Sequence, residues 1–220
     1  MNALARLALP LAALALALPA AAETKTETRD VSGFTALGLA APIDVELAIG
    51  DREGVVLEGD AEMLARIDVY VEKGSLQIRR KRETSDWSFG WNHKSVRARV
   101  SAKRIDAISI SGSGEVKAPQ LSGDSLALAI SGSGDITIGA GKVGNLSVHI
   151  AGSGDIKTPK VDAQVVSVSI SGSGDALVWA RQSLAVQVAG SGDVRYYGDP
   201  TVAKSVSGSG SVKRLGAAPT

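Results

Sequence analysis

The chain of 220 residues contains no cysteine, only two histidines and few aromatic residues, which make up 4% of its composition. The lack of cysteine excludes disulfides, cysteine-based zinc sites, thiol catalysis and the lipid anchor that bacterial lipoproteins carry on a cysteine. The two histidines, His93 and His149, belong to no motif that would form a catalytic triad or a metal site. We therefore expect no catalytic residue, no cofactor and no metal.

Neither sign of charge dominates the chain, which has 24 basic and 23 acidic residues. Removing residues 1–22 takes away Arg6 and no acid, which leaves 23 basic against 23 acidic residues. A nucleic-acid-binding domain should be visibly basic. The balance therefore predicts that nucleic acid is not a partner.

The one long hydrophobic run lies at the N-terminus. One positive charge stands in residues 1–6, residues 7–18 are almost entirely Leu and Ala, and Ala20, Ala21 and Ala22 form a small-residue cleavage site. We predict a signal peptide over 1–22 and an exposed segment over 23–29; a retained N-terminal helix is the alternative. The run is too short to span a membrane. We expect no membrane span after cleavage, and a location in the periplasm, the cell envelope or the medium.

A short turn sequence occurs six times in the second half of the chain. Gly-Ser-Gly follows Ser111, Ser131, Ala151, Ser171, Ala189 and Ser207, at spacings of 20, 20, 20, 18 and 18 residues. A fixed period near 20 residues predicts a solenoid. Glycine in such turns allows the backbone to reach positive φ. The predicted turn glycines are Gly112, Gly114, Gly132, Gly134, Gly152, Gly154, Gly172, Gly174, Gly190, Gly192, Gly208 and Gly210.

Strands with one buried face precede and follow each turn. Apolar residues such as Ile108 and Ile110 alternate with small polar ones such as Ser109, which is the period of a half-buried strand. The inward positions are mostly β-branched. The pattern predicts an all-β fold, a β-helix with about 18–20 residues per coil and coils stacked at about 4.8 Å. Second turns are expected at Pro119, Gly139, Pro159 and 198–200.

Residues 30–104 have the same alternation without the Gly-Ser-Gly sequence. Strands are expected at 43–47, 54–58, 67–71 and 75–79, and a helical turn at 61–65. We interpret this part as the irregular first coils of one domain over 30–216, with the repeats in 105–216. A separate small β domain is the alternative.

Several of these segments together resemble a known family. Val31-Ser32-Gly33-Phe34 leads into a first strand, strands follow at 43–47 and 74–78, and the Gly-Ser-Gly turns complete the series. This order is similar to the GIN domain of exported bacterial proteins, the head region of auto-transporter adhesins, over about residues 30–216. The resemblance implies a single-stranded, right-handed parallel β-helix and export to the envelope. It does not imply an enzyme and supplies no catalytic motif.

The acidic residue after each turn is the first candidate for a site. Stacking should place Glu115, Asp135, Asp155, Asp175 and Asp193 in one column, where neighbouring carboxylates repel by roughly 1 kcal/mol. Calcium could offset that repulsion. We expect instead that each carboxylate accepts hydrogen bonds from the N–H groups of its own turn.

Two groups of aromatic residues are candidate binding surfaces. Trp87, Phe89 and Trp91 lie in a polar stretch with basic neighbours, which suits contact with a sugar, a protein or a membrane interface. Their alternative role is to cover the open end of the helix. Trp179, Tyr196 and Tyr197 fall at matching places on adjacent coils and could form one patch, with core packing as the alternative.

We interpret the chain as a non-enzymatic envelope protein whose β-helical surface is adhesin-like and binds polysaccharide or another envelope protein. A glycan-active β-helix enzyme is one alternative, and it would need two or three acids or bases close together in a groove. A structural spacer is the other.

The predicted signal peptide can be tested directly. We expect mass spectrometry of the protein from envelope fractions to find an N-terminus within a residue or two of Glu23, because cleavage should follow Ala22. An intact Met1 in those fractions would refute the assignment.

Overall fold

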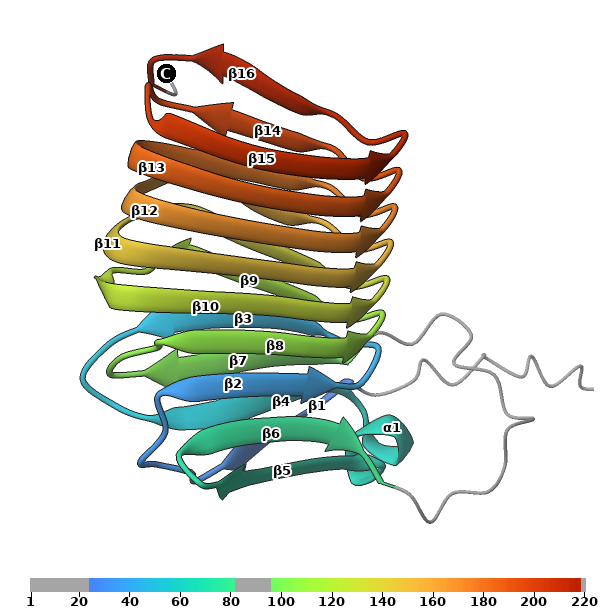
Figure 1. The fold of residues 1–220 in the computed structure, drawn as a ribbon. Coiled ribbons are helices and arrows are strands. Elements are labelled where there is room, and N and C mark those ends of the chain that lie inside the picture. Colours follow the sequence, from blue (N-terminus) through green and yellow to red (C-terminus); the bar gives the residue numbers. More distant parts are fainter. Residues whose placement is uncertain (1–23, 82–95, 219–220) are drawn as a thin grey trace, which may run out of the picture.

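Stacked coils of β-strand make up almost all of the part of the chain that the structure describes (Figure 1). The structure, a computed structural model, describes residues 24–81 and 96–218. The sixteen strands found in these residues all belong to one hydrogen-bonded sheet that winds around a single axis, so the predicted all-β solenoid is confirmed. The helix in these residues, α1, spans Ala61–Ala65. The strands are β1 Thr24–Arg29, β2 Ala36–Ala40, β3 Asp44–Ile49, β4 Gly54–Asp60, β5 Ile67–Glu72, β6 Ser75–Arg80, β7 Arg97–Ala102, β8 Ala107–Gly112, β9 Glu115–Gln120, β10 Gly123–Gly132, β11 Asp135–Gly152, β12 Ile156–Gly172, β13 Ala176–Gly190, β14 Val194–Tyr197, β15 Thr201–Gly208 and β16 Val212–Gly216.

Each regular coil contributes one strand segment to each of two faces. The segments that end at a Gly-Ser-Gly turn form the front of Figure 1: β8, β10, the second halves of β11, β12 and β13, and β15. We call this the Ser/Ala face. The segments that follow the turn form the opposite face, which we call the Asp face: β9, the first halves of β11, β12 and β13, β14 and β16.

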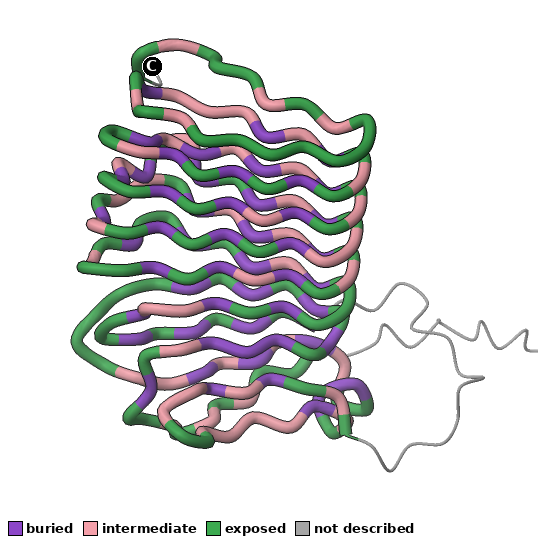
Figure 2. The backbone as a smooth tube through the Cα atoms, in the orientation of Figure 1, coloured by how far each residue is buried: buried purple, intermediate pink, exposed green. Residues whose placement is uncertain are grey.

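The core lies between the two faces and follows the alternation of the sequence (Figure 2). Residues one coil apart pair in register, so Ile110, Ile130 and Ile150 stand above one another. These side chains are at most 1% exposed. One cluster of buried apolar residues extends from Phe34 to Val194, which a single coil could not bury alone.

The predicted second turns are wrong at three of the four positions. Pro119, Gly139 and Pro159 lie inside strands β9, β11 and β12. Strands β11, β12 and β13 run through the second corner without a break, because backbone pairing between coils continues there, as at Gly141 and Val161. Residues 198–200 do separate β14 from β15, as expected.

The first coils do not stack in chain order. Strand β2 pairs in parallel with β6 and β8, and β3 pairs in parallel with β7 and β9. The coil formed by β2 and β3 therefore lies between two coils that come later in the sequence. At this end β4 pairs antiparallel with β1 and β7, and β5 pairs antiparallel with β6, so the stack is not parallel throughout.

Each end of the stack carries features that oppose further strand pairing. At the N-terminal end α1 contacts β1, β4 and β5 and buries Met63 and Leu64. In the last coil Lys204 aligns with the inward Val186, and Arg214 aligns with Tyr196. Charges at inward positions of an edge strand oppose pairing with another chain.

The two glycines of each turn are needed for different physical reasons. Gly132, Gly152 and Gly172 have φ between 131° and 137°, which confirms the prediction for these positions. Gly154 has no positive φ; a Cβ there would overlap the carbonyl oxygen of Gly134 in the coil below. Ser153 between them is exposed, and its N–H donates to the Gly132 carbonyl oxygen at 2.9 Å. Backbones of successive turns are therefore in direct contact.

Substitution of one turn glycine should be far more damaging than substitution of the adjacent serine. We expect Gly152→Val to lower the free energy of unfolding by at least about 1–3 kcal/mol, because it strains φ and its side chain meets Gly132. Ser153→Ala should cost less than about 1 kcal/mol, since its backbone hydrogen bond remains. Denaturant unfolding of both variants measures the difference. Equal losses would contradict the stacked-turn geometry.

Candidate functional site

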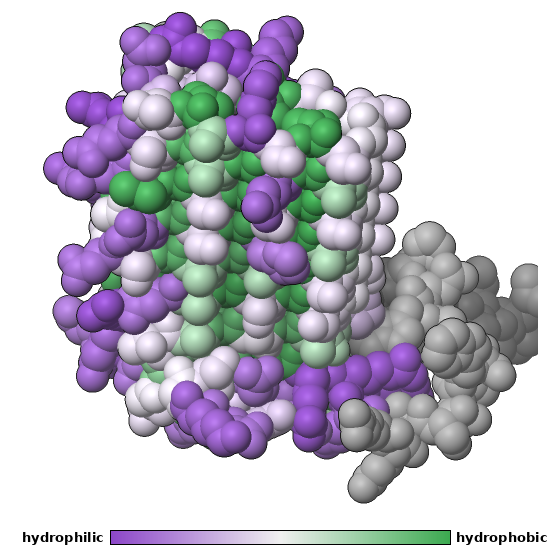
Figure 3. Space-filling model, viewed as in Figure 1, coloured by the Kyte–Doolittle hydropathy of each residue, from purple (hydrophilic) through white to green (hydrophobic). Residues whose placement is uncertain are grey.

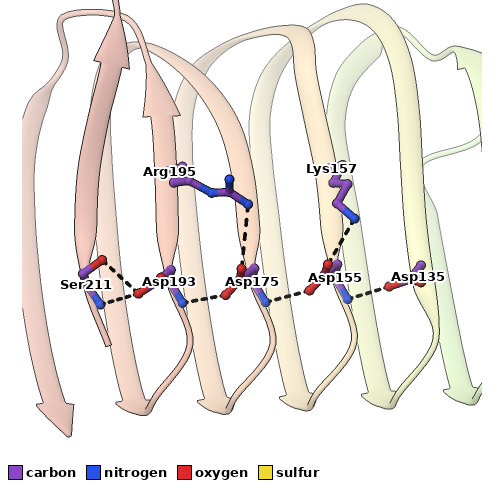
Figure 4. A network of polar contacts seen from close by, with 7 residues as sticks. All are labelled: Asp135, Asp155, Lys157, Asp175, Asp193, Arg195 and Ser211. Atoms are coloured by element: carbon purple, nitrogen blue, oxygen red, sulfur yellow. Dashed lines mark hydrogen bonds and ion pairs between the residues drawn. The ribbon is translucent and has the colours of Figure 1, made fainter. Parts of the chain in front are cut away.

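The acidic residues after the turns form a ladder of hydrogen bonds between coils (Figure 4). Oδ1 of Asp135 accepts from the backbone N–H of Asp155 at 2.9 Å, and Oδ1 of Asp155 accepts from that of Asp175 at 3.1 Å. Oδ1 of Asp175 accepts from the N–H of Asp193 at 2.9 Å. The expected bonds to each residue's own turn are wrong. Stacking brings the N–H of the next coil closer to the carboxylate, and the bond then joins two coils.

The second oxygen of two ladder carboxylates faces a basic side chain of the Asp face. Oδ2 of Asp155 lies 3.0 Å from Nζ of Lys157, and Oδ2 of Asp175 lies 3.7 Å from the Arg195 guanidinium. These contacts reduce the repulsion between neighbouring carboxylates. Within the described ranges, no group of three or more His, Cys, Asp or Glu side chains is placed to hold a metal ion.

The ladder begins and ends where the residue type changes. The longer side chain of Glu115 bonds to Lys117 at 2.8 Å, and this hydrogen bond raises the pKa of Lys117, with the charge of Glu115 acting in the same direction. At the other end both the N–H and the hydroxyl of Ser211 donate to Asp193, at 2.9 and 2.8 Å. Ser211 has no carboxylate to offer a further coil.

Two of the three predicted aromatic residues of the later coils stand side by side on the Asp face. Trp179 and Tyr197 pair in register, and both are half-buried. The Arg181 guanidinium lies 5.7 Å from the centre of the Trp179 ring. Tyr196 does not join them: it pairs with the inward Val178 and packs against the core. The prediction of one patch of three is therefore wrong for Tyr196, because the strand alternation turns it inward.

A polar hollow adjoins Trp179 at the second corner. The hollow encloses about 350 Å³, and the backbone of Trp179 pairs with that of Asp162 on its rim. Asp162 lies 3.5 Å from the Arg181 guanidinium. An aromatic face beside amides and charged groups is a surface that can stack on a sugar ring and hydrogen-bond its hydroxyls. The residues that line the hollow are Lys142, Asp162, Gln164, Arg181 and Gln182.

A second depression lies further down the same face, over β3 and β9. Two adjoining hollows of about 600 and 530 Å³ share Ala48 and Pro119. Short residues such as Ala48 and Pro119 line this space together with longer charged ones. Two cations of the lining are paired: Arg99 lies 3.0 Å from Glu58, and Lys117 bonds to Glu115. Arg99 and Lys117 therefore already have acidic partners, and neither is an unpaired charge for a ligand in this depression.

The remaining predicted residues fall into two groups. Trp87, Phe89, Trp91 and His93 lie outside the described residues. His149 is exposed on the Ser/Ala face and has only small neighbours in register, Ala129 and Ser169. A search of residues 24–81 and 96–218 finds no helix long and apolar enough to cross a membrane.

The family model described as "Putative auto-transporter adhesin, head GIN domain" matches residues 33–200. The chain belongs to this family. The GIN-domain resemblance predicted from the turns is thereby confirmed. No curated protein matches the chain significantly.

Solved structures of bacterial proteins share the fold of this GIN domain. A "putative adhesin" from Bacteroides fragilis NCTC 9343 has a TM-score of 0.71 at 20% identity, covering 89% of this chain and 98% of that one. A "putative adhesin" from Parabacteroides merdae ATCC 43184 gives 0.60 at 19%, covering 88% and 96%. A "putative lipid binding protein" from Parabacteroides distasonis ATCC 8503 gives 0.52 at 23%, covering 87% and 96%. At these identities the likeness establishes the fold alone.

The ladder predicts a specific pattern of stability changes. We expect Asp155→Ala to lower the free energy of unfolding by about 1–3 kcal/mol, because the N–H of Asp175 loses its acceptor. Asp155→Asn should cost less, since an amide oxygen can still accept. Asp124→Ala, at an exposed carboxylate outside the ladder, is the control. Thermal or denaturant unfolding would contradict the ladder if all three variants lost the same stability.

Proposed function

We propose that this GIN-domain protein is an exported, non-enzymatic binding protein of the cell envelope that holds polysaccharide on its Asp face. One observation carries the proposal: Trp179 and Tyr197 stand in register, half-exposed, beside a hollow rich in hydrogen-bonding groups. Aromatic faces bind the apolar faces of sugar rings, and amide and charged groups bind their hydroxyls.

The rigidity of the solenoid supports this role. Both aromatic residues lie on strands whose backbones are bonded to the coils on either side. Sites on strands are held more precisely than sites on loops. The spacing between Trp179 and Tyr197 is that of adjacent strands, about 4.8 Å. A polymer that lies across the coils would therefore meet two aromatic rings in succession.

The uses of the acidic side chains support binding rather than hydrolysis. A glycosidase needs two carboxyl groups free to exchange protons and attack a sugar. In the ladder Asp135, Asp155 and Asp175 each accept a backbone hydrogen bond from the next coil. These carboxylates therefore hold successive coils together. The adhesin names of the family and of the similar structures agree with a binding role, and export rests on the predicted signal peptide.

Removal of either aromatic ring should weaken polysaccharide binding. We expect Trp179→Ala and Tyr197→Ala each to lower affinity on the order of ten-fold, or about 1.4 kcal/mol. The mature protein would first be screened on a glycan array, and the strongest ligand then titrated by calorimetry.

The matched control is Tyr70→Ala, which removes a tyrosine from β5, far from the hollow in sequence and in the stack. The control variant should bind as the natural protein does, and no reducing ends should be released from the polysaccharide. Equal loss in all three variants, no bound glycan, or release of reducing ends would each refute the proposal.

A further inference from the structure

The Ser/Ala face differs from the opposite face of the solenoid in its lack of charge. Its outward positions are the odd-numbered residues of 107–111, 125–131, 145–151, 165–171, 183–189 and 201–207, and all are exposed or half-exposed. None of them is Asp, Glu, Lys or Arg. Charged residues make up 21% of the whole chain, so random placement would have put several of them here.

The opposite face shows that the coils tolerate charge at outward positions. The corresponding positions of the Asp face include Lys117, Asp135, Lys157, Asp175 and Arg195. The two faces share one backbone and one core, so the fold itself does not forbid charge on the Ser/Ala face. Charge on a protein surface favours solubility and the monomeric state.

The Ser/Ala face is also flat. Figure 1 shows its strands running alongside one another with little twist. Figure 3 shows columns of small, pale side chains with hydrophobic columns visible between them, and with a few hydrophilic residues within the face and more around its margins. Flat sheets of many strands are typically stabilised by stacking or by side-chain ladders, and the inner side of this sheet already stacks on the Asp face through the core. Its flat outer side can contact a second flat surface over its whole area. Most outward side chains here are Ser or Ala, which let a second flat surface approach closely; the longer ones include His149, Val165 and Gln187.

The dimensions of the face match what a stable dimer needs. Six strands at about 4.8 Å and seven residues at about 3.3 Å give about 29 Å by 23 Å. That is roughly 660 Å² per copy and 1,300 Å² for two copies, within the range of roughly 1,200–2,000 Å² for specific interfaces.

We propose that two copies of this chain pair through their Ser/Ala faces, in a twofold arrangement that stacks one sheet on the other. A twofold interface uses the same patch on both copies, and a face without charge is self-complementary in this sense. The inward Lys204 and Arg214 of the last coil oppose growth end to end, which favours a closed pair over a fibre.

This arrangement has a consequence for binding but does not rest on the polysaccharide proposal. Face-to-face pairing leaves both Asp faces on the outside, with Trp179 and Tyr197 of each copy directed away from the interface. Two sites on one particle would raise avidity for a repetitive surface.

The test compares two substitutions in one strand. Ser147 lies in the middle coils of the Ser/Ala face between Ala127 and Ser167, and Thr137 lies in β11 on the Asp face between Lys117 and Lys157. Ser147→Glu places two carboxylates in the twofold interface, whereas Thr137→Glu changes the net charge equally outside it. Analytical ultracentrifugation of the mature protein should find a dimer at micromolar concentration. Ser147→Glu should raise the dissociation constant at least ten-fold, and Thr137→Glu should leave it unchanged.

Crosslinking provides a second readout, since the chain has no cysteine of its own. Ser147→Cys should crosslink between copies with a short bis-maleimide, and Thr137→Cys should not, because opposed sheets lie about 10 Å apart. A monomer at high micromolar concentration would overturn the proposal, as would equal crosslinking of both variants. A monomeric protein whose glycan binding is abolished by Ser147→Glu would also overturn the proposal, because the Ser/Ala face would then be the surface that binds the polymer.

Two other outcomes separate the dimer from the polysaccharide site. If Trp179→Ala loses glycan binding but still forms the dimer, the pairing is supported. If the protein forms the dimer but binds no glycan, only the polysaccharide site is refuted.

Discussion

Direct contact between the backbones of successive Gly-Ser-Gly turns is the constraint on which the other features depend. A Cβ at Gly152 or Gly154 would overlap the carbonyl oxygens of the coil below. With no side chain between them, the N–H of Ser153 reaches the carbonyl of Gly132, and the carboxylate of Asp135 reaches the N–H of Asp155. Register is thereby fixed at one edge of each coil, and the Ile and Val columns follow from it along both faces.

How far the sequence predicts this fold depends on whether a segment carries the repeat. Six turn sequences at nearly constant spacing predict the coils, the inward columns and the positive φ of Gly152, since each follows from stacking identical units. The position of β2 and β3 between later coils could not be predicted. That order depends on pairing between distant segments that share no repeated sequence. The unbroken second corner was also missed, because Pro119 and Gly139 are common in turns and here stand at outward strand positions.

The candidate site could be predicted in part from the sequence. The step that was missed was to use the alternation of inward and outward side chains along each strand. Trp179 and Tyr197 each lie four residues after the ladder aspartate of their coil, so counting from Asp175 and Asp193 pairs them. Tyr196 lies three residues after Asp193, at a position whose side chain points inward in every regular coil. The polar hollow beside Trp179 had no such signal. It lies beside the shift in register between Lys157 and Asp162, where the spacing of the coils changes from 20 to 18 residues.

Stacking also explains where function can reside in such a fold. Inward positions of the regular coils are mostly Ile, Val, Leu and Ala because they form the core, and the glycines of the turns are required by backbone contact. Only outward positions are free to vary, and here they are divided between a face with paired charges and aromatic rings and a face with none. Outward residues at equivalent positions of successive coils are one strand spacing apart, so a side chain substituted in one coil lies directly beside those of the neighbouring coils. In the polysaccharide-binding role proposed above, recognition would therefore depend on columns of side chains: a polymer would contact two rings in register, Trp179 and Tyr197, and a single ring would bind it weakly.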